Sequence, residues 1–526
     1  MILFGDIHIH VFDLVLIVVY LVGMIAFGFY YSRHVKGAHD YFLAGRSLPW
    51  WVVGMSIVGS NLGSNDYVGA AGGGYRIGIA QANFEWIGAI PAMILCAFIF
   101  IPYFWRAGVY SIPEYLGLRY NQAVRVIAAL ILSFFSLFIV GIYLWATATM
   151  LQVYVGIDIS VGVWITAVVV GLYTITGGMA AVAISDTVQF GIMIAGGLAL
   201  AVLGVHRIGG VDEFVTRLST EFPNHLNAFL PADHAEFPWP GVLLGLALVM
   251  SPSYWCANQV ILQRTFAAKS RWDGQAAMIF AAFAKTVMPF LIILPGFLVL
   301  LMSTDSLENQ DQALPWLIRE VLPPGLSGLL FVAFIAALQS SVDSTLNSTA
   351  VMLTRDVYGV VKKSDANMND AAERESRDRS DLRLGKWITF SVLALGVLFA
   401  LNIDSVKSQF RGIYSFVQLG LSYFQGPMFA LLLLGILTRS VTASAGVWGL
   451  GLGVLSAVYM GSFGLPGMAG GELNMLYIAF YSFLFTVGLL FAISPFTAAK
   501  SDEQLRNLTI QTTDKQRADD SAEREG

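Results

Sequence analysis

Charged residues are scarce in this sequence. They make up 12% of its 526 residues, about half the share of a soluble globular domain, which excludes an ordinary soluble fold. Cysteine is almost absent, and its two residues, Cys96 and Cys256, lie in apolar stretches. They indicate neither a disulfide framework nor a metal site. The seven histidines match no ligand spacing, so we expect no resident metal centre.

Catalytic and signalling features are also missing. The chain has no HExxH or GxSxG motif. Its glycine triplet, Gly72–Gly74, lacks the strand–loop–helix context of a phosphate-binding loop. The start, MILFGDIHIH, lacks the basic region of a cleavable signal peptide. Residues 496–526 are too few for a signalling module. We therefore expect neither an enzyme nor a sensor, and no nucleic-acid or obligate protein partner.

Long apolar runs dominate what remains. The mean hydropathy is +0.68, and a membrane-spanning helix needs about 20 apolar residues. The pattern predicts an all-α integral membrane protein with about thirteen spans. The predicted spans lie near residues 11–31, 50–73, 80–103, 124–154, 160–177, 183–205, 240–262, 275–302, 326–353, 386–402, 410–436, 441–463 and 474–495. A short helix is a further expectation in the loop 206–238.

Basic residues predict the orientation of the chain. Lys and Arg are concentrated in alternate loops, including the loop with Arg264, Lys269 and Arg271 and the charge-rich loop 355–386. Because cytoplasmic loops carry the excess of Lys and Arg, we expect the N-terminus outside and the C-terminus in the cytoplasm of a plasma-membrane protein. Residues 1–495 then form a single transporter domain. Loop 355–386 is expected to be a flexible linker, and residues 496–526 a disordered cytoplasmic tail.

The second predicted span is unusually polar and rich in glycine. It reads GMSIVGSNLGSNDYVGAAGGGY from Gly54 to Tyr75, with Asn61, Asn65 and Asp66 close together. Irregular backbone at membrane depth is tolerated only where it lines a protein cavity. The stretch predicts a helix that breaks near Gly59–Leu62 and frees its carbonyls. Close helix packing through small residues is the alternative.

A second interrupted span lies five spans later. SPSYWCANQ, from Ser251 to Gln259, places Pro252, Tyr254 and Asn258 in an apolar run. Paired interrupted spans indicate a secondary transporter built from inverted repeats. We expect the two core repeats near residues 50–205 and 240–436.

Ionisable residues inside the spans are candidates for function, because burying charge in a membrane is costly. They are Asp66, Glu85, Asp186, Lys285 and Asp343. The ninth span adds a hydroxyl-rich stretch, AALQSSVDSTLNSTA, whose oxygens suit a hard cation such as sodium. Structural ion pairs are the alternative for the charged residues, and bonding back to the helix is the alternative for the hydroxyls.

Six motifs give the chain a family resemblance. DYFLAGRSLPWW, the glycine-rich second span, YSIPEYLGLRYN, GGMAAVAISDTVQ, QRTFAAKS and SSVDSTLNSTA occur in this order. Together they resemble the sodium:solute symporter family, most of all its sodium–glucose cotransporter branch. The resemblance implies a LeuT-type five-plus-five inverted-repeat core and sodium as the coupling ion.

The resemblance also implies two sets of cation ligands. The first cation set comprises the carbonyls of Gly59, Leu62 and Ala337 and the hydroxyls of Ser340 and Ser341. The second cation set is a candidate for another sodium ion and comprises Asp186, Asp343 and Ser344, with Ser340 as a further partner. Relatives carry an uncharged residue at the position of Asp343, so this carboxylate either strengthens the second site or carries a proton.

The implied cargo is a sugar or a sugar-like polyol. Glu85, Lys285 and Gln418 match the sugar ligands of the family, Asn61 matches a further polar contact, and Tyr254 matches the aromatic residue that covers the sugar. Asp66 and Ser251 match substrate positions but differ in residue type from sugar-binding relatives. A sodium symporter for a carboxylate, such as a sialic or uronic acid, a monocarboxylate or an amino acid, is the alternative. A structural Glu85–Lys285 pair without a substrate role also stays open.

Overall fold

The computed structural model describes residues 10–33, 35, 37–62, 65–303, 307, 309–323, 325–362, 371–403, 413–465 and 473–513. These residues form helices joined by short turns and contain no β-sheet. The helices are α1 (Val11–Ser32), α2 (Ala38–Leu43), α3 (Trp50–Asn61), α4 (Ala70–Ile77), α5 (Ile90–Leu95), α6 (Ile101–Ala107), α7 (Ile112–Arg119), α8 (Gln122–Val155), α9 (Ile159–Ile208), α10 (Val211–Glu221), α11 (Trp239–Gly241), α12 (Ser251–Ala257), α13 (Gln259–Phe266), α14 (Arg271–Ile292), α15 (Leu294–Met302), α16 (Ala313–Val321), α17 (Leu326–Val351), α18 (Gly359–Val361), α19 (Ala371–Leu401), α21 (Ile413–Leu437), α22 (Ala443–Phe463) and α23 (Met475–Ile493).

The helices account for the predicted membrane spans in three ways. Among the described residues, ten helical segments are long and apolar enough to cross a membrane. Two shorter apolar helices, Val11–Phe27 and Ile159–Leu172, match the first and fifth predicted spans. The second predicted span is divided between α3 and α4. The all-α membrane fold is therefore confirmed. The predicted number of thirteen membrane spans is not confirmed by the lengths of these helices.

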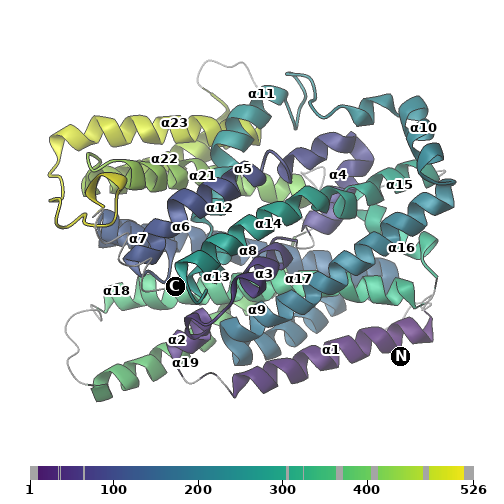
Figure 1. The fold of residues 1–526 in the computed structure, drawn as a ribbon, viewed down its shortest axis with the longest axis horizontal. Helices are drawn as coiled ribbons and strands as arrows, with labels where there is room; N and C mark the ends of the chain where they lie inside the picture. Colours follow the sequence, from purple (N-terminus) through teal and green to yellow (C-terminus); the bar gives the residue numbers. More distant parts are fainter. Residues whose placement is uncertain are drawn as a thin grey trace.

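The centre of the bundle is built from α3, α9, α14 and α17. Helix α17 packs along α9, and α3 packs against both α9 and α14, although these helices are far apart in the sequence (Figure 1). Of the candidate spans, the one containing α17 is the most deeply buried. Its hydroxyl-rich face therefore meets protein rather than lipid. Helix α1 lies along α9 at one side, and α22 and α23 pack beside α21 at the other (Figure 1).

Helix α9 covers both the fifth and the sixth predicted spans, and Gly178 interrupts it between them. Its φ of +63° and ψ of −167° interrupt the helix. This backbone conformation is accessible to glycine and strained for other residues. A Cβ atom at this position would also lie 2.9 Å from the carbonyl oxygen of Tyr41. The glycine therefore allows the two spans to turn where α2 packs closely against them.

Two segments that we expected to be irregular contain ordered structure. Within loop 355–386, α18 and the first half of α19 are helical, and the carboxylate of Asp378 accepts a hydrogen bond from the backbone N–H of Ala38 (3.0 Å). The prediction of a flexible linker is wrong for these residues, which are helical and contact α2 through Asp378. Residues 363–370 lie outside the description. The short helix expected in loop 206–238 is confirmed as α10.

The first part of the tail packs onto the bundle rather than extending from it as expected. Leu505 is fully buried, and the Tyr115 hydroxyl donates to the carbonyl of Leu508 (2.5 Å). Arg439 pairs with Asp502 (2.9 Å). The burial of Leu505 and Leu508 supplies apolar stabilisation that composition alone did not reveal. The prediction of disorder is therefore wrong up to residue 513, and residues 514–526 lie outside the description.

Candidate functional site

The predicted interruption of the second span is present, and it exposes backbone carbonyls in the centre of the bundle. Helix α3 ends at Asn61, and Leu62 has non-helical dihedrals of φ −83° and ψ 65°. The last carbonyls of a helix have no partner within it, and one of them, Ser60 O, accepts a hydrogen bond from the Ser341 hydroxyl (3.1 Å). Gly63 and Ser64 lie outside the description.

The first cation set is drawn together by the contact between α3 and α17. The Ser341 hydroxyl lies within hydrogen-bond distance of the carbonyls of Ser60 (3.1 Å) and Ala337 (3.2 Å). Gly59 lies so close to α9 that a Cβ atom there would be 3.2 Å from the carbonyl of Asp186. Leu62 is buried at the end of the broken helix. Carbonyl and hydroxyl oxygens of this kind fit the ligand preference of a hard cation.

Ser340 points toward the second cation set rather than only toward the first. Its hydroxyl donates to Asp186 Oδ1 (2.5 Å) and lies 3.3 Å from the hydroxyl of Ser60. The Ser344 hydroxyl donates to the carboxylate of Asp343 (3.0 Å) and lies 3.1 Å from Ser60 Oγ. All of these side chains are buried. The residues predicted for the two cation sites therefore form one continuous polar cluster.

A protein cation, Arg264, lies inside this cluster. Its guanidinium is 3.1 Å from Asp186 Oδ2 and donates to the hydroxyl of Ser56 (2.7 Å). The same group donates to the hydroxyls of Ser60 and Ser344. Arg264 and Asp186 are 1% and 0% exposed. The prediction that Arg264 lies in a basic loop is wrong: α13 carries its side chain inward, where buried hydrogen-bond acceptors satisfy it.

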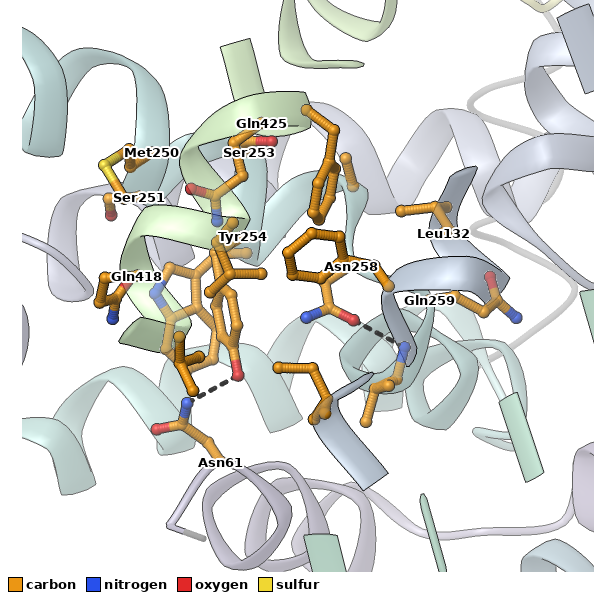
Figure 2. A pocket seen from close by; sticks show the side chains of 18 of the residues that line it. Asn61, Leu132, Met250, Ser251, Ser253, Tyr254, Asn258, Gln259, Gln418 and Gln425 are labelled. Atoms are coloured by element: carbon orange, nitrogen blue, oxygen red, sulfur yellow. Dashed lines mark hydrogen bonds between the residues drawn. The ribbon is translucent and has the colours of Figure 1, made fainter. Parts of the chain in front are cut away.

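A cavity of about 130 Å³ lies next to this cluster. Six of the seven predicted substrate residues line it: Asn61, Glu85, Ser251, Tyr254, Lys285 and Gln418. They come from α3, from the turn after Phe84, and from α12, α14 and α21. Figure 2 shows Asn61 joined to Tyr254, with the Asn61 amide donating to the Tyr254 hydroxyl (3.0 Å). The side chain of Asp66, the seventh residue, lies outside the description.

Glu85 and Lys285 form a closed ion pair in the wall of the cavity. The Lys285 ammonium contacts Glu85 Oε2 and lies 5.6 Å from the centre of the Trp255 ring. Both charged side chains are almost fully buried. A buried pair of opposite charges contributes no net charge, so this wall of the cavity is polar but neutral overall.

The cavity extends toward the end of the bundle where basic loops meet, which we call the basic end. Lys269 N donates to Leu48 O there (2.9 Å), and the Arg355 guanidinium stacks 3.7 Å from the Tyr110 ring. Gln259, which lines the cavity, accepts from Ile112 N (2.9 Å) and donates to Tyr110 O (3.1 Å). These bonds hold α13 against the turn that precedes α7.

A third buried ion pair lies at the basic end. Arg125 Nε lies 2.8 Å from Asp356 Oδ1, and its Nη2 lies 3.4 Å from Glu114. The Ser111 hydroxyl donates to Asp356 Oδ2 (2.7 Å). Arg125 stands at the start of the predicted span 124–154, and Asp356 stands at the start of the predicted loop 355–386. Their positions at span ends were the available signal, but charge at a span end does not reveal which way a side chain turns.

Comparison with known proteins gives one consistent result. The sequence model of the sodium:solute symporter family matches residues 41–453. The sodium/glucose cotransporter of Vibrio parahaemolyticus is 29% identical over 95% of this chain and 92% of its own length. Sodium/glucose cotransporter 1 of Ovis aries is 30% identical over 98% of this chain and 83% of its own length.

Solved structures agree with this result at the level of the fold. A Na⁺-coupled sialic acid symporter, solved in a substrate-bound outward-open state, has a TM-score of 0.80 at 22% identity. The match covers 93% of this chain and 99% of that one. This likeness supports the expected LeuT-type membrane fold and carries no information on the cargo.

Proposed function

Because this chain belongs to the sodium:solute symporter family, we propose that it imports a sugar or sugar-like polyol together with sodium by alternating access. The observation that carries the proposal is the closed Glu85–Lys285 pair in a cavity that also presents the amides of Asn61 and Gln418. Such a lining offers both donors and acceptors to a ring of hydroxyl groups. The chain is a transporter by family, and nothing in this proposal requires a chemical reaction.

The ion pair favours a neutral cargo over a carboxylate. Lys285 is the cavity-lining residue that would pair with an acid, and its ammonium is already engaged by Glu85. An added carboxylate would leave a net negative charge in a buried site, which is costly. The sodium/glucose cotransporters named above, at about 30% identity, support the same choice.

Sodium is the coupling ion of the family, and we propose the first cation set as its site. An ion held by carbonyls at the end of α3 and by the hydroxyls of Ser340 and Ser341 would bind two helices at once. An ion changes a conformational equilibrium only by binding the two states unequally. Sodium would therefore favour the state in which α3 and α17 stay together. One charge moving through 100 mV supplies about 2.3 kcal/mol for uphill uptake.

The second cation set binds an ion only when Arg264 leaves it. The guanidinium uses Asp186, Ser60 and Ser344 as partners, so a second sodium ion would compete for the same oxygens. A cation role for Asp343 is tested by measuring the sodium-to-cargo ratio in the wild type and in Asp343→Asn. An unchanged ratio, an unchanged coupling to the gradient and an unchanged pH profile in the variant would together reject a cation role for Asp343.

For the orientation, we propose that the basic end faces the cytoplasm of a plasma-membrane protein. The loops that meet there carry Arg46, Arg106, Lys269 and Arg355, in agreement with the excess of basic residues on cytoplasmic loops. The C-terminal tail packs at the helix α7 that borders this end. Labelling of single cysteines introduced at the two ends of the bundle in intact cells would test this orientation.

Uptake into proteoliposomes tests the proposed function. A sodium gradient should drive accumulation of at least one labelled sugar or polyol, and choline in place of sodium should abolish it. Lys285→Met and Glu85→Gln should both lower uptake, whereas Arg439→Gln, at an exposed ion pair, should not. Sodium-driven uptake of an acid with no uptake of any sugar would overturn the proposal.

A further inference from the structure

A second glutamine lines the cavity on α21. Gln418, Leu421, Gln425 and Met428 recur at spacings of three and four, so they share one face of the helix, and all four line the cavity. Figure 2 shows Gln418 and Gln425 among the lining side chains. Gln425 is 3% exposed, and its amide oxygen has no hydrogen-bond partner among the described residues. A buried unpaired acceptor on a residue that lines a cavity indicates a missing donor.

Apolar side chains are prominent in the lining that Gln425 shares. Leu132, Phe135, Phe424 and Met428 all line the cavity, and Phe424 packs against Phe135 of α8 with ring centroids 4.5 Å apart. Packing alone would favour leucine or methionine at this position, because an amide without a partner is costly in such an environment. Gln425 is therefore poorly explained as a structural residue.

Its position differs from that of the predicted substrate residues. Seven residues of helix place Gln425 about 10 Å along α21 from Gln418. The cavity continues past Tyr254 to Asn258 and Gln259, and Gln259 marks the basic end. Gln425 therefore lies on a wall of the cavity that leads from the Glu85–Lys285 pair toward that end.

We propose that Gln425 is the polar contact of an inner subsite, which a hydroxylated solute occupies after it leaves Gln418 and passes Tyr254. This inference rests on the proposed function for the chemistry of the cargo. A solute rich in hydroxyl groups gives up hydrogen bonds to water when it passes apolar side chains. The amide oxygen of Gln425 accepts from one of these hydroxyls and replaces a lost bond. The subsite thereby lowers the barrier between the binding site and the basic end.

The experiment separates binding from turnover. Gln425→Met keeps the length of the side chain and removes its acceptor, and Gln425→Ser is a smaller second variant if the first is poorly expressed. Ser422→Ala is the matched control, since Ser422 is buried on the same helix, bonds to Leu419 O and does not line the cavity. Gln418→Met provides the comparison for the primary site.

Sodium-dependent equilibrium binding and sodium-driven uptake of the best labelled sugar are measured for each purified variant. Loss of one neutral hydrogen bond changes a rate by roughly two- to tenfold, so Gln425→Met should lower turnover by that factor with an unchanged Kd. Gln418→Met should raise the Kd, and Ser422→Ala should change neither quantity. A raised Kd in Gln425→Met would place Gln425 in the primary site and overturn the inner subsite, as would an unchanged turnover.

The result is distinguishable from a failure of the proposed function. If the wild type transports an acid and no sugar, the proposed cargo is wrong. The same variants are then measured with that acid. An unchanged turnover in Gln425→Met would then reject the inner subsite as well, whereas a selective loss of turnover would retain it for a different solute.

Discussion

Replacing one partner of the buried Arg264–Asp186 pair should destabilise the protein far more than breaking a surface pair. Asp186→Asn leaves the guanidinium of Arg264 buried at 1% exposure without its carboxylate. Breaking a buried pair in this way costs roughly 3–5 kcal/mol, because one charge stays uncompensated. The matched control is Asp502→Asn, whose partner Arg439 is exposed. A surface pair contributes about 0–1 kcal/mol.

Removing both charges of the Arg264–Asp186 pair should recover part of the lost unfolding free energy. The double variant Asp186→Asn with Arg264→Met leaves no buried charge unpaired at this pair, and the hydroxyls of Ser56 and Ser340 can still bond to the asparagine. Its loss of unfolding free energy should therefore be smaller than the sum of the two single losses, since the two residues contact each other directly. Thermal unfolding of the four purified proteins in the same detergent measures this coupling.

Repeating the thermal unfolding of these four proteins in sodium and in choline tests the cation sites. In Arg264→Met the oxygens of Asp186, Ser60 and Ser344 lose the guanidinium that occupies them. A ligand present at 100 times its Kd stabilises the native state by about 2.7 kcal/mol. Sodium in place of choline should therefore stabilise Arg264→Met more than it stabilises the wild type. Two results together would refute these expectations: Asp186→Asn lowers the unfolding free energy no more than Asp502→Asn does, and sodium does not stabilise Arg264→Met more than it stabilises the wild type.

Three further predictions concern the cargo, the tail and the driving force. Glu85→Gln and Lys285→Met should each raise the KM of uptake about 10- to 100-fold, because a hydrogen bond to a charged group contributes about 1.5–3 kcal/mol; an unchanged KM would make the pair purely structural. Leu505→Ala should lower the unfolding free energy by about 2–5 kcal/mol. Ile510 is 46% exposed, so Ile510→Ala should lie within about 0.5 kcal/mol of the wild type. Equal melting temperatures of the two variants would contradict the packing of the tail. With a neutral cargo and one sodium ion, a potential of 100 mV alone should support roughly 50-fold accumulation of the cargo, from about 2.3 kcal/mol per charge. The plateau of uptake in valinomycin-clamped vesicles measures this accumulation. A plateau that does not depend on the potential would exclude net charge movement.

The sequence was most informative where polarity conflicted with burial. The glycines, serines and amides of residues 54–75 predicted the end of α3, and that end is present at Asn61. The family resemblance assigned Glu85, Lys285 and Gln418 to one substrate site, and they line one cavity. Membrane burial makes each such residue costly, so its presence is a strong signal even without coordinates.

The sequence was least informative for charges near the ends of spans. Arg264 was assigned to a basic loop and Arg125 to the start of a predicted span, although both turn inward to buried carboxylates. A long basic side chain at this depth either extends to water or folds back into the protein, and only the position of an acceptor decides between them. Asp356 lies 231 residues from Arg125 in the chain, and sequence spacing cannot show that contact.

Ser60 contacts residues of both proposed cation sets. Its carbonyl accepts from Ser341 in the first set, while its hydroxyl contacts Arg264 and Asp186 in the second. The carbonyl is available because α3 ends one residue later. Any displacement of the end of α3 therefore alters both sets together. Arg264 belongs to α13, which Gln259 holds at the basic end, so the proposed sodium site and α13 share Ser60 as a common contact.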